Sequence, residues 1–295
     1  MPLVSVVIPA YNAASFIDAS VGSVLAQSFR DLEIVVVDDG STDATADRVR
    51  AFGQRVRLVR QTNRGVSAAR NAGVSLAQGR YVAFLDADDA WQPAKIDRQM
   101  EALRRHGDCG ACYTAIQIAD AQMRPFAEQR SADGIVSRAE LLVRGNVVTG
   151  SASAVLCEKD AMVAAGGFDE QLSLCADWDA WVRLAERTRF AYVDEPLVVY
   201  RRTGASMSCN PKVLERDTLL LLRKAFSTCP GSRSLRARAY GRQYRVLAGS
   251  YLRSGHRAAA LRCLARAAGS DPRQLLYALA MPWRAARRRA TTPES

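Results

Sequence analysis

The sequence lacks any long run of apolar residues. No window of its 295 residues approaches the roughly 18 consecutive apolar residues that a membrane-spanning helix needs. The chain also enters a strand-like segment, Leu3 to Pro9, directly after its first residues, without the charged and then apolar stretch of a secretory signal. We therefore expect neither a membrane span nor a signal peptide.

Histidine is scarce and the cysteines form no recognisable framework. The chain has two histidines and seven scattered cysteines, an odd number that fits a reducing compartment better than a set of disulfides. Cys109 and Cys112 have the spacing of a redox or metal motif, but no second pair or histidine follows at ligand distance. Core packing is the favoured interpretation of this pair, and we expect a cytoplasmic protein.

The excess of positive charge, +11 overall, is confined to the last part of the chain. Residues 211–295 hold 18 Lys and Arg against 4 Asp and Glu, whereas the first 210 residues hold 23 against 26. The tail has no aromatic interleaving and no recognised nucleic-acid module, so we expect no nucleic-acid partner. Its balance, and the run Arg284, Arg287, Arg288 and Arg289 after an apolar stretch, predict peripheral association with an anionic membrane surface on the inner face.

The first 90 residues alternate apolar strand-like runs with amphipathic segments. This alternation predicts an α/β fold with a mostly parallel, mixed central sheet and flanking helices. Because no GxGxxG follows the first predicted strand, a Rossmann dehydrogenase is disfavoured. Strands are expected at 3–9, 32–38, 56–60 and 80–86, and helices at 13–26, 44–52 and 66–77.

The second half of the chain changes character at Pro211. Before it we expect helices at 93–105, 138–144 and 177–186, strands at 110–119, 152–157, 190–193 and 197–201, and an irregular polar stretch after residue 119. After it, Leu, Ala and Arg recur at helical spacing, with two short helices expected around Ser254 to His256. The sequence predicts a catalytic domain over 1–210 and a small all-helical extension over 211–295.

Acidic residues follow two of the predicted strands at their carboxyl ends. Asp38 and Asp39 follow the second strand, and Asp86, Asp88 and Asp89 follow the fourth. Ligands of open parallel sheets bind beyond these strand ends, and clustered carboxylates suit a hard divalent cation that neutralises a departing diphosphate. A solvated acidic turn or a helix cap is the alternative for an acidic cluster taken alone.

Four segments in order resemble the family 2 glycosyltransferases of the GT-A fold. They are Val4 to Asn12 (VSVVIPAYN), Asp38 to Asp43 (DDGSTD), Asn63 to Gly73 (NRGVSAARNAG) and Phe84 to Asp89 (FLDADD). The likeness continues through Gly167 to Glu170 and Asp177 to Trp181 to about Ser208. Each motif lies on the predicted helix, strand or loop that the family requires, so the motifs and the predicted secondary structure agree.

The resemblance implies a site for a nucleotide sugar at the strand ends. Its residues would be Pro9, Tyr11, Asn12, Asp39, Arg70, Asp86 and Asp88. Tyr11 and Asp39 would hold the nucleoside, Arg70 would lie near the base or diphosphate, and Asp88 would ligate a divalent metal, Mn²⁺ or Mg²⁺. Asp86 would contact the ribose or the sugar phosphate.

The resemblance also implies a single displacement with inversion at the anomeric carbon, which needs one general base. Asp177 stands where the family has its base, although its usual glutamate neighbour is Ala176 here; a helix N-cap is the alternative role. A histidine found in relatives is replaced by Thr203, which leaves Arg201 as a candidate diphosphate contact. Trp178 and Trp181 would either line an acceptor site or pack in the core.

These features predict an inverting transferase that moves a sugar from a nucleotide diphosphate, with UDP favoured by the resemblance, to an acceptor hydroxyl. The expected acceptor is a saccharide or a lipid-linked molecule in surface polysaccharide or glycolipid synthesis. The alternative is a catalytically retired transferase domain that acts as a binding or scaffold protein through its basic tail. Ala176 and Thr203 are the features that favour this alternative.

Overall fold

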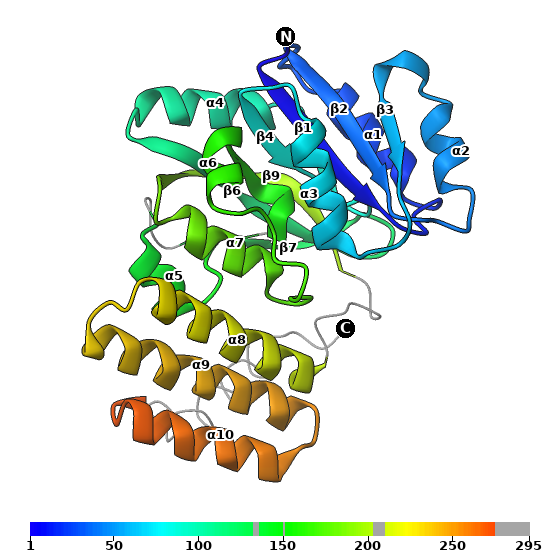
Figure 1. The fold of residues 1–295 in the computed structure, drawn as a ribbon. Helices are drawn as coiled ribbons and strands as arrows, with labels where there is room; N and C mark the ends of the chain where they lie inside the picture. The colour runs from blue at the N-terminus through cyan, green and yellow to red at the C-terminus, as the bar shows by residue number, and fades with distance from the viewer. Residues whose placement is uncertain (132–135, 150, 203–209, 275–295) are drawn as a thin grey trace. The chain divides into compact units, whose positions relative to one another are not determined.

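The computed structural model describes residues 1–131, 136–149, 151–202 and 210–274 (Figure 1). Thr203 and the terminal arginine run lie outside the described residues. The chain divides into two compact units, one of Met1–Leu141 with Asn146–Met207 and one of Leu142–Gly145 with Ser208–Ser295. The second unit thus takes in four residues from the middle of the segment expected to be catalytic.

The first unit is built on a mixed sheet of nine strands within the described residues, in the order β3-β2-β1-β4-β8-β6-β9-β5, with β7 paired to β6. The four neighbouring strands β3, β2, β1 and β4 are parallel to one another. Strand β8 runs antiparallel to both β4 and β6, and β9 is parallel to β6. The expected GT-A-type α/β fold is therefore confirmed. The strands are β1 Val4–Ala10, β2 Leu32–Asp38, β3 Arg57–Arg60, β4 Tyr81–Phe84, β5 Ala90–Trp91, β6 Cys109–Ala119, β7 Pro125–Gln129, β8 Val155–Glu158 and β9 Arg189–Arg201.

Both faces of the central strands β1 and β4 are buried, which is why these strands are continuous apolar runs. Alternate residues of β1 and β2, such as Val6 and Val36, pack in one cluster with residues of α1 and α4, whereas Val35 and Val37 pack with α3. Helix α3 approaches β1 so closely that a Cβ on Gly73 would lie 2.2 Å from a Val7 methyl. The helices are α1 Ile17–Leu25, α2 Thr45–Arg50, α3 Val66–Leu76, α4 Lys95–Arg105, α5 Arg138–Arg144, α6 Lys159–Ala164 and α7 Ala176–Leu184.

The structure differs from the sequence-based expectation at several places in the first unit: the short elements β5 and α6 were not expected, and β7, β9 and β8 differ as follows. Strand β7 lies in the stretch expected to be irregular, because all five of its residues are exposed and give no apolar alternation. The two strands expected near residues 190 and 197 are one strand, β9, with register shifts in its pairing around Pro196. The strand expected at 152 begins at Val155, after a 3₁₀ turn over Ser151–Ala154.

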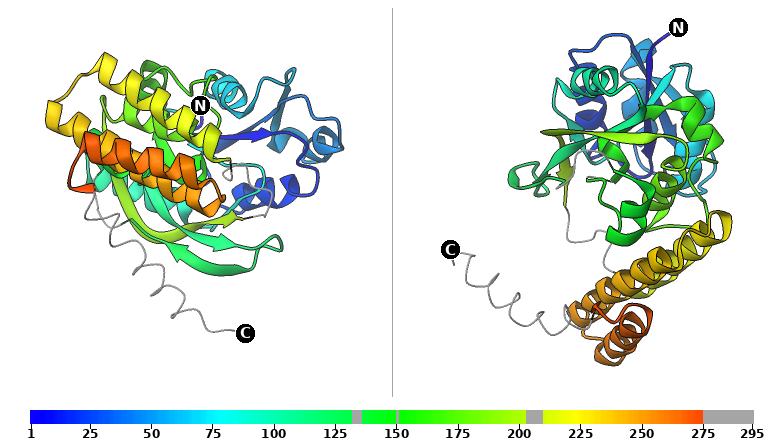
Figure 2. Two further views of the ribbon diagram at one scale, coloured as in Figure 1. Left: turned by 90° about the horizontal axis from the view of Figure 1, so that it is seen from below. Right: turned by 90° about the vertical axis from the view of Figure 1, so that its left-hand side faces the viewer.

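The second unit contains the helices α8 Pro211–Thr228, α9 Arg233–Arg253 and α10 Arg257–Ser270, and α9 packs against both others (Figures 1 and 2). Asn210 caps α8, because its side-chain oxygen accepts hydrogen bonds from the backbone N–H groups of Lys212 and Val213. Helix α9 has 21 residues, so the expectation of two short helices around Ser254 was wrong for the first of them. Among the residues that the structure describes, no helix is both long enough and apolar enough to cross a membrane.

Candidate active site

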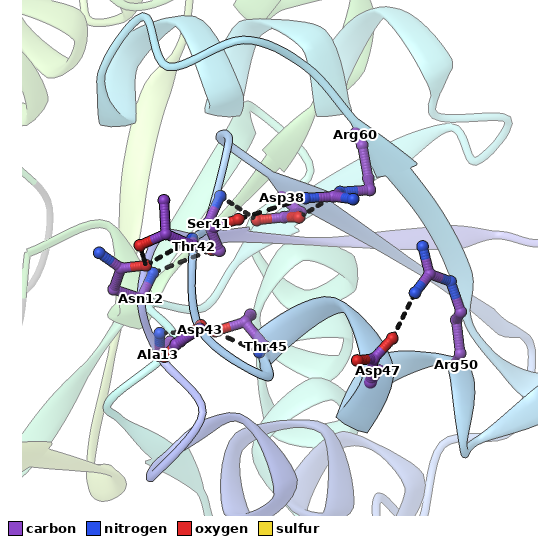
Figure 3. A network of polar contacts seen from close by, with 10 residues as sticks. All are labelled: Asn12, Ala13, Asp38, Ser41, Thr42, Asp43, Thr45, Asp47, Arg50 and Arg60. Carbon is purple, nitrogen blue, oxygen red and sulfur yellow. Dashed lines mark hydrogen bonds and ion pairs between the residues drawn. The ribbon is translucent and has the colours of Figure 1, made fainter.

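The loops that follow β1 and β2 are tied to each other by hydrogen bonds (Figure 3). The Asn12 backbone N–H donates to Ser41 Oγ at 2.9 Å, and Asn12 Oδ1 accepts from the Thr42 N–H at 2.9 Å. Asn12 has a φ of 48°, a left-handed conformation that asparagine tolerates better than most residues. Buried Asp38 completes the tie, since it accepts from the Ser41 N–H and from Arg60 Nε. Asn12 is therefore a positioning residue for this edge of the sheet.

Asp39 holds the segment that leads into α3. It is buried, and its carboxylate accepts hydrogen bonds from Gln61 Nε2 at 2.7 Å and from the backbone N–H groups of Arg64 at 2.9 Å and Gly65 at 2.7 Å. Gly40 has a φ of +77°, and a Cβ there would lie 2.8 Å from the Asn63 nitrogen. The turn after Asp39 therefore requires glycine.

Pro9 and Tyr11 have opposite environments although only one residue separates them. Pro9 is buried within β1, where it lies beside Val37 of β2. Tyr11 lies beyond the strand end and is 52% exposed. Its ring is thus available at the strand-end rim, whereas Pro9 shapes the backbone that presents it.

Arg70 reaches from α3 to the acidic loop after β4. It is 5% exposed, and its Nη2 lies 2.5 Å from Asp86 Oδ1. The guanidinium also lies over the Phe168 ring at 5.2 Å from the centroid. Its Nε is buried without a hydrogen-bond partner among the described residues. A buried cation with an unused donor is suited to an anionic ligand.

Asp88 and Asp89 have different surroundings. Burial raises the pKa of Asp88, and the nearby Asp86 charge adds to this, while Arg201 and Arg70 oppose it. No hydrogen bond or ion pair joins the Asp88 carboxylate to another side chain within the described parts of the chain. Burial, with Asp86 and Asp88 nearby, raises the pKa of Asp89 well above its usual range, although it accepts from Ser153 Oγ and the Arg201 N–H. Asp88 is thus the member of the loop open to a new partner.

Asp177 lies in the first turn of α7 and shares the electrostatic environment of the acidic loop after β4. Burial raises its pKa and the Asp86 charge adds to this, whereas Arg70 lowers it. Asn146 Nδ2 donates to Asp177 Oδ2 at 3.0 Å. The structure therefore brings Arg70, Asp86, Asp88 and Asp177 into one charged cluster, although they come from three separate segments, α3, the loop after β4 and α7.

Comparison with known families identifies this arrangement. Residues 5–157, just over half of the chain, match the model of Glycosyl transferase family 2. The chain belongs to this family. The matched region contains the strand-end residues from Pro9 to Asp89, and the resemblance found in the sequence is confirmed.

Similar proteins include other glycosyltransferases. TuaG of Bacillus subtilis, a glycosyltransferase assigned to teichuronic acid biosynthesis, is 31% identical over 76% of this chain and 88% of its own. The Escherichia coli chondroitin synthase is 31% identical over 68% of this chain and 29% of its own. The crystal structure of S. aureus TarS 1-349 in complex with UDP-GlcNAc has the same fold, with a TM-score of 0.62, 17% identity and 90% of each chain covered.

The sequence suggested three other residues of this family 2 glycosyltransferase, Trp178, Trp181 and Arg201, as contacts for the acceptor or the diphosphate. In the structure each of them contacts other parts of the protein. Trp178 and Trp181 are 5% and 0% exposed; Trp178 Nε1 donates to the Leu141 carbonyl, and Trp181 packs against Phe84, Phe168 and Phe190. Both tryptophans therefore pack in the core. The alternative, that they line an acceptor site, was wrong, because both rings are buried. Arg201 Nε donates to the Asp88 carbonyl at 2.9 Å, so Arg201 holds the acidic loop in place.

The side chains at the strand ends suit a metal site completed by oxygen atoms of a bound ligand better than one made of protein side chains alone. No group of three His, Cys, Asp or Glu side chains converges as a metal site among the described residues. A cation here would instead take Asp88 and oxygen ligands from a bound diphosphate. Burial, and after it the like charge of Asp86, raises the pKa of Asp88, and a divalent charge beside the carboxylate would offset both effects.

Three residues of the family 2 site carried no signal in the sequence. Ser153 Oγ accepts from the Asp86 N–H at 3.0 Å and donates to Asp89 Oδ2 at 2.6 Å, so one hydroxyl joins both ends of the acidic loop. Asn146 contacts Asp177, as described above. Tyr200 lies near the acids, and burial together with their charges raises its pKa to about 12, so it is a neutral phenol. None belongs to a motif, and only the fold brings them to the site.

Proposed function

We propose that this family 2 glycosyltransferase moves a sugar from a nucleotide diphosphate sugar, with UDP as the nucleotide, to an acceptor hydroxyl with inversion. The observation that carries the proposal is the cluster of Asp86, Asp88, Asp177 and the buried Arg70 at the strand ends. The TarS structure determined with UDP-GlcNAc has the same fold, which supports the choice of nucleotide. Exposed Tyr11 would stack on the base.

Asp177 is proposed as the general base. The acceptor hydroxyl attacks the anomeric carbon, its proton passes to the Asp177 carboxylate, and the bond to the diphosphate oxygen breaks with its electrons. Asn146 donates to Asp177 Oδ2 and the Trp178 backbone N–H donates to Asp177 Oδ1 at 2.8 Å, so both oxygens of the carboxylate are held in place. Because its pKa is raised, Asp177 is a stronger base than an exposed aspartate would be.

The leaving diphosphate requires positive charge near it. Arg70 would supply one fixed charge, and its unused Nε would donate to a phosphate oxygen. A divalent cation held by Asp88 would supply Lewis-acid charge stabilisation. Asp86, already paired with Arg70, would accept from the donor's ribose or sugar hydroxyls.

The acceptor is proposed to be a growing surface polysaccharide or a lipid-linked saccharide. This choice follows from the two similar proteins named for teichuronic acid biosynthesis and chondroitin synthesis. Peripheral association of the basic extension with an anionic membrane would bring the enzyme to a lipid-linked acceptor.

The test is calorimetric binding of UDP, GDP and dTDP with and without Mn²⁺, followed by hydrolysis of the matching sugar nucleotide. We expect Mn²⁺-dependent binding of UDP that Asp88→Asn abolishes, and donor hydrolysis that Asp177→Asn slows by at least about 100-fold while UDP binding is retained. Asp47→Asn is the matched control, since Asp47 is an exposed α2 residue paired with Arg50.

Two outcomes would contradict the proposal. Turnover that survives Asp177→Asn would remove the assigned base. Failure of every nucleotide to bind would favour the scaffold alternative, in which the transferase domain is retired and the basic helices carry the function.

A further inference from the structure

The helical unit has a pocket of its own. Its volume is about 700 Å³, within the range of sites that hold small molecules. Residues near the start of α8 and around the start of α10 line it, and most of the ionisable ones are basic. The charged and titratable lining residues are Lys212, Glu215, Arg216, Tyr251, His256, Arg257 and Arg262.

The single carboxylate of this pocket is already neutralised. Glu215 accepts a hydrogen bond from Tyr251 Oη at 2.6 Å and one from Arg262 Nη2 at 3.0 Å. Arg266 forms a further ion pair with it at 3.6 Å. The Glu215 side chain is 13% exposed, so its charge faces these partners rather than the open pocket.

Two basic side chains remain without an acidic partner. Within the described residues, Lys212 and Arg257 form no ion pair, and both are exposed at the pocket. Arg216 pairs with buried Asp217 but keeps 59% of its side chain exposed. Because Lys212 and Arg216 are four residues apart, they lie on the same face of α8. The pocket therefore has a positive balance that no described protein group offsets.

The start of α10 adds backbone donors to this charge. No side chain caps the helix among the described residues, and Ala258 and Ala259, in its first turn, line the pocket. The first N–H groups of a helix have no partner within it, and the helix dipole adds partial positive charge there. Basic side chains from two helices and these free N–H groups together match a tetrahedral anion.

We propose that this pocket binds a phosphate group, either the headgroup of an anionic lipid or lipid-linked diphosphate, or a soluble phosphate compound. Lys212 and Arg257 are its principal charged contacts, Arg216 is a third, and the first turn of α10 donates from the backbone. Glu215 is a positioning residue that holds Arg262 and Tyr251 at the wall. The site is separate from the proposed transfer reaction and does not depend on it.

The test compares two charge-matched double variants of the full chain. Lys212→Gln with Arg257→Gln removes the two unpaired charges of the pocket. Arg233→Gln with Arg253→Gln removes two exposed charges of α9 that do not line it. Both leave the proposed donor site intact, and an unchanged midpoint of thermal unfolding serves as the check that each variant is folded.

Calorimetry with inorganic pyrophosphate in EDTA forms the first arm. Sedimentation with phosphatidic acid vesicles, and with phosphatidylcholine vesicles as the neutral reference, forms the second. We expect the pocket variant to weaken binding at least about tenfold in one or both arms, and the α9 variant to change it less than about twofold. Loss of vesicle binding alone identifies a lipid headgroup, and loss of pyrophosphate binding alone identifies a soluble phosphate.

Equal weakening by the two variants in both arms would overturn the proposal, because the attraction would then follow net charge. Unchanged binding in the pocket variant would overturn it as well, since the anion would be held elsewhere. An absence of binding to either probe by the unaltered protein would have the same meaning.

Discussion

Replacing Arg70 by methionine removes a buried cation from the acidic site. Methionine keeps much of the side-chain packing against Phe168 but leaves Asp86 without its partner. Removing one member of a buried ion pair costs about 3–5 kcal/mol in the free energy of unfolding. Since the Asp86 side chain keeps 22% exposure and water can partly replace the guanidinium, we expect the lower end, about 3 kcal/mol.

Urea unfolding of a double-mutant cycle measures this cost. If the ion pair is its cause, Asp86→Asn should restore much of the stability lost in Arg70→Met, because the uncompensated charge is then gone. Arg48→Met is the control. Arg48 pairs with Asp18 at the surface, both about half exposed, and its loss should cost about 0–1 kcal/mol.

Catalysis should respond differently from stability. Arg70 lowers the pKa of Asp177, so Arg70→Met should move the acidic limb of the pH–rate profile to higher pH. Asp86→Asn should not restore turnover, since the charge that faces the diphosphate is still missing. A variant as stable as the unaltered protein within about 0.5 kcal/mol, with an unshifted limb, would refute the assignment.

Three other predictions follow from the site and its support. Ser153→Ala should lower stability by about 1–3 kcal/mol and raise the KM for the donor, because the acidic loop loses its shared hydroxyl; unchanged urea unfolding and kinetics would contradict this. Activity should fall as the pH drops through the Asp177 pKa, which lies above that of an ordinary aspartate, since the base must be ionised; a limb that persists in Asp177→Asn would belong to another group. Gly73→Ala should destabilise by about 1–3 kcal/mol because its Cβ would overlap a methyl of β1, whereas Gly22→Ala, with nothing within 4 Å, should stabilise by up to about 1 kcal/mol; thermal unfolding of the pair checks both signs.

The first 90 residues were the most predictable part of the chain. Strand β2 has the bounds that the sequence indicated, and β1, β3, β4 and α3 differ from theirs by at most two residues at either end. These elements are buried on both faces or amphipathic, so hydrophobic periodicity reports them directly. The positions of Asp39 and Asp86 at the carboxyl ends of β2 and β4, the two strands that flank β1, follow from the same reasoning.

The remaining features depend on contacts between distant segments. Strand β7 is exposed throughout and exists through pairing with β6, which local pattern does not reveal. Ser153 lies 67 residues from Asp86 in sequence, and no spacing rule links a serine in a 3₁₀ turn to an acidic loop. The burial of Trp181 likewise follows from three aromatic rings contributed by β4, β9 and the turn before α7. From the sequence alone, a tryptophan at this position could equally pack in the core or line a sugar-binding site.

Hydrogen bonds between Asn12, Ser41 and Thr42 fix the shape of the loop after β1, and this shape does not depend on the side chain of Tyr11. Tyr11 makes no contribution to these ties, which use the backbone and side chain of its neighbour. Substitution of Tyr11 would therefore change the side chain available to stack on a nucleotide base, while the loop keeps its shape. Under the proposed stacking of Tyr11 on the base, base preference would thus be open to redesign at this position with little cost in folding.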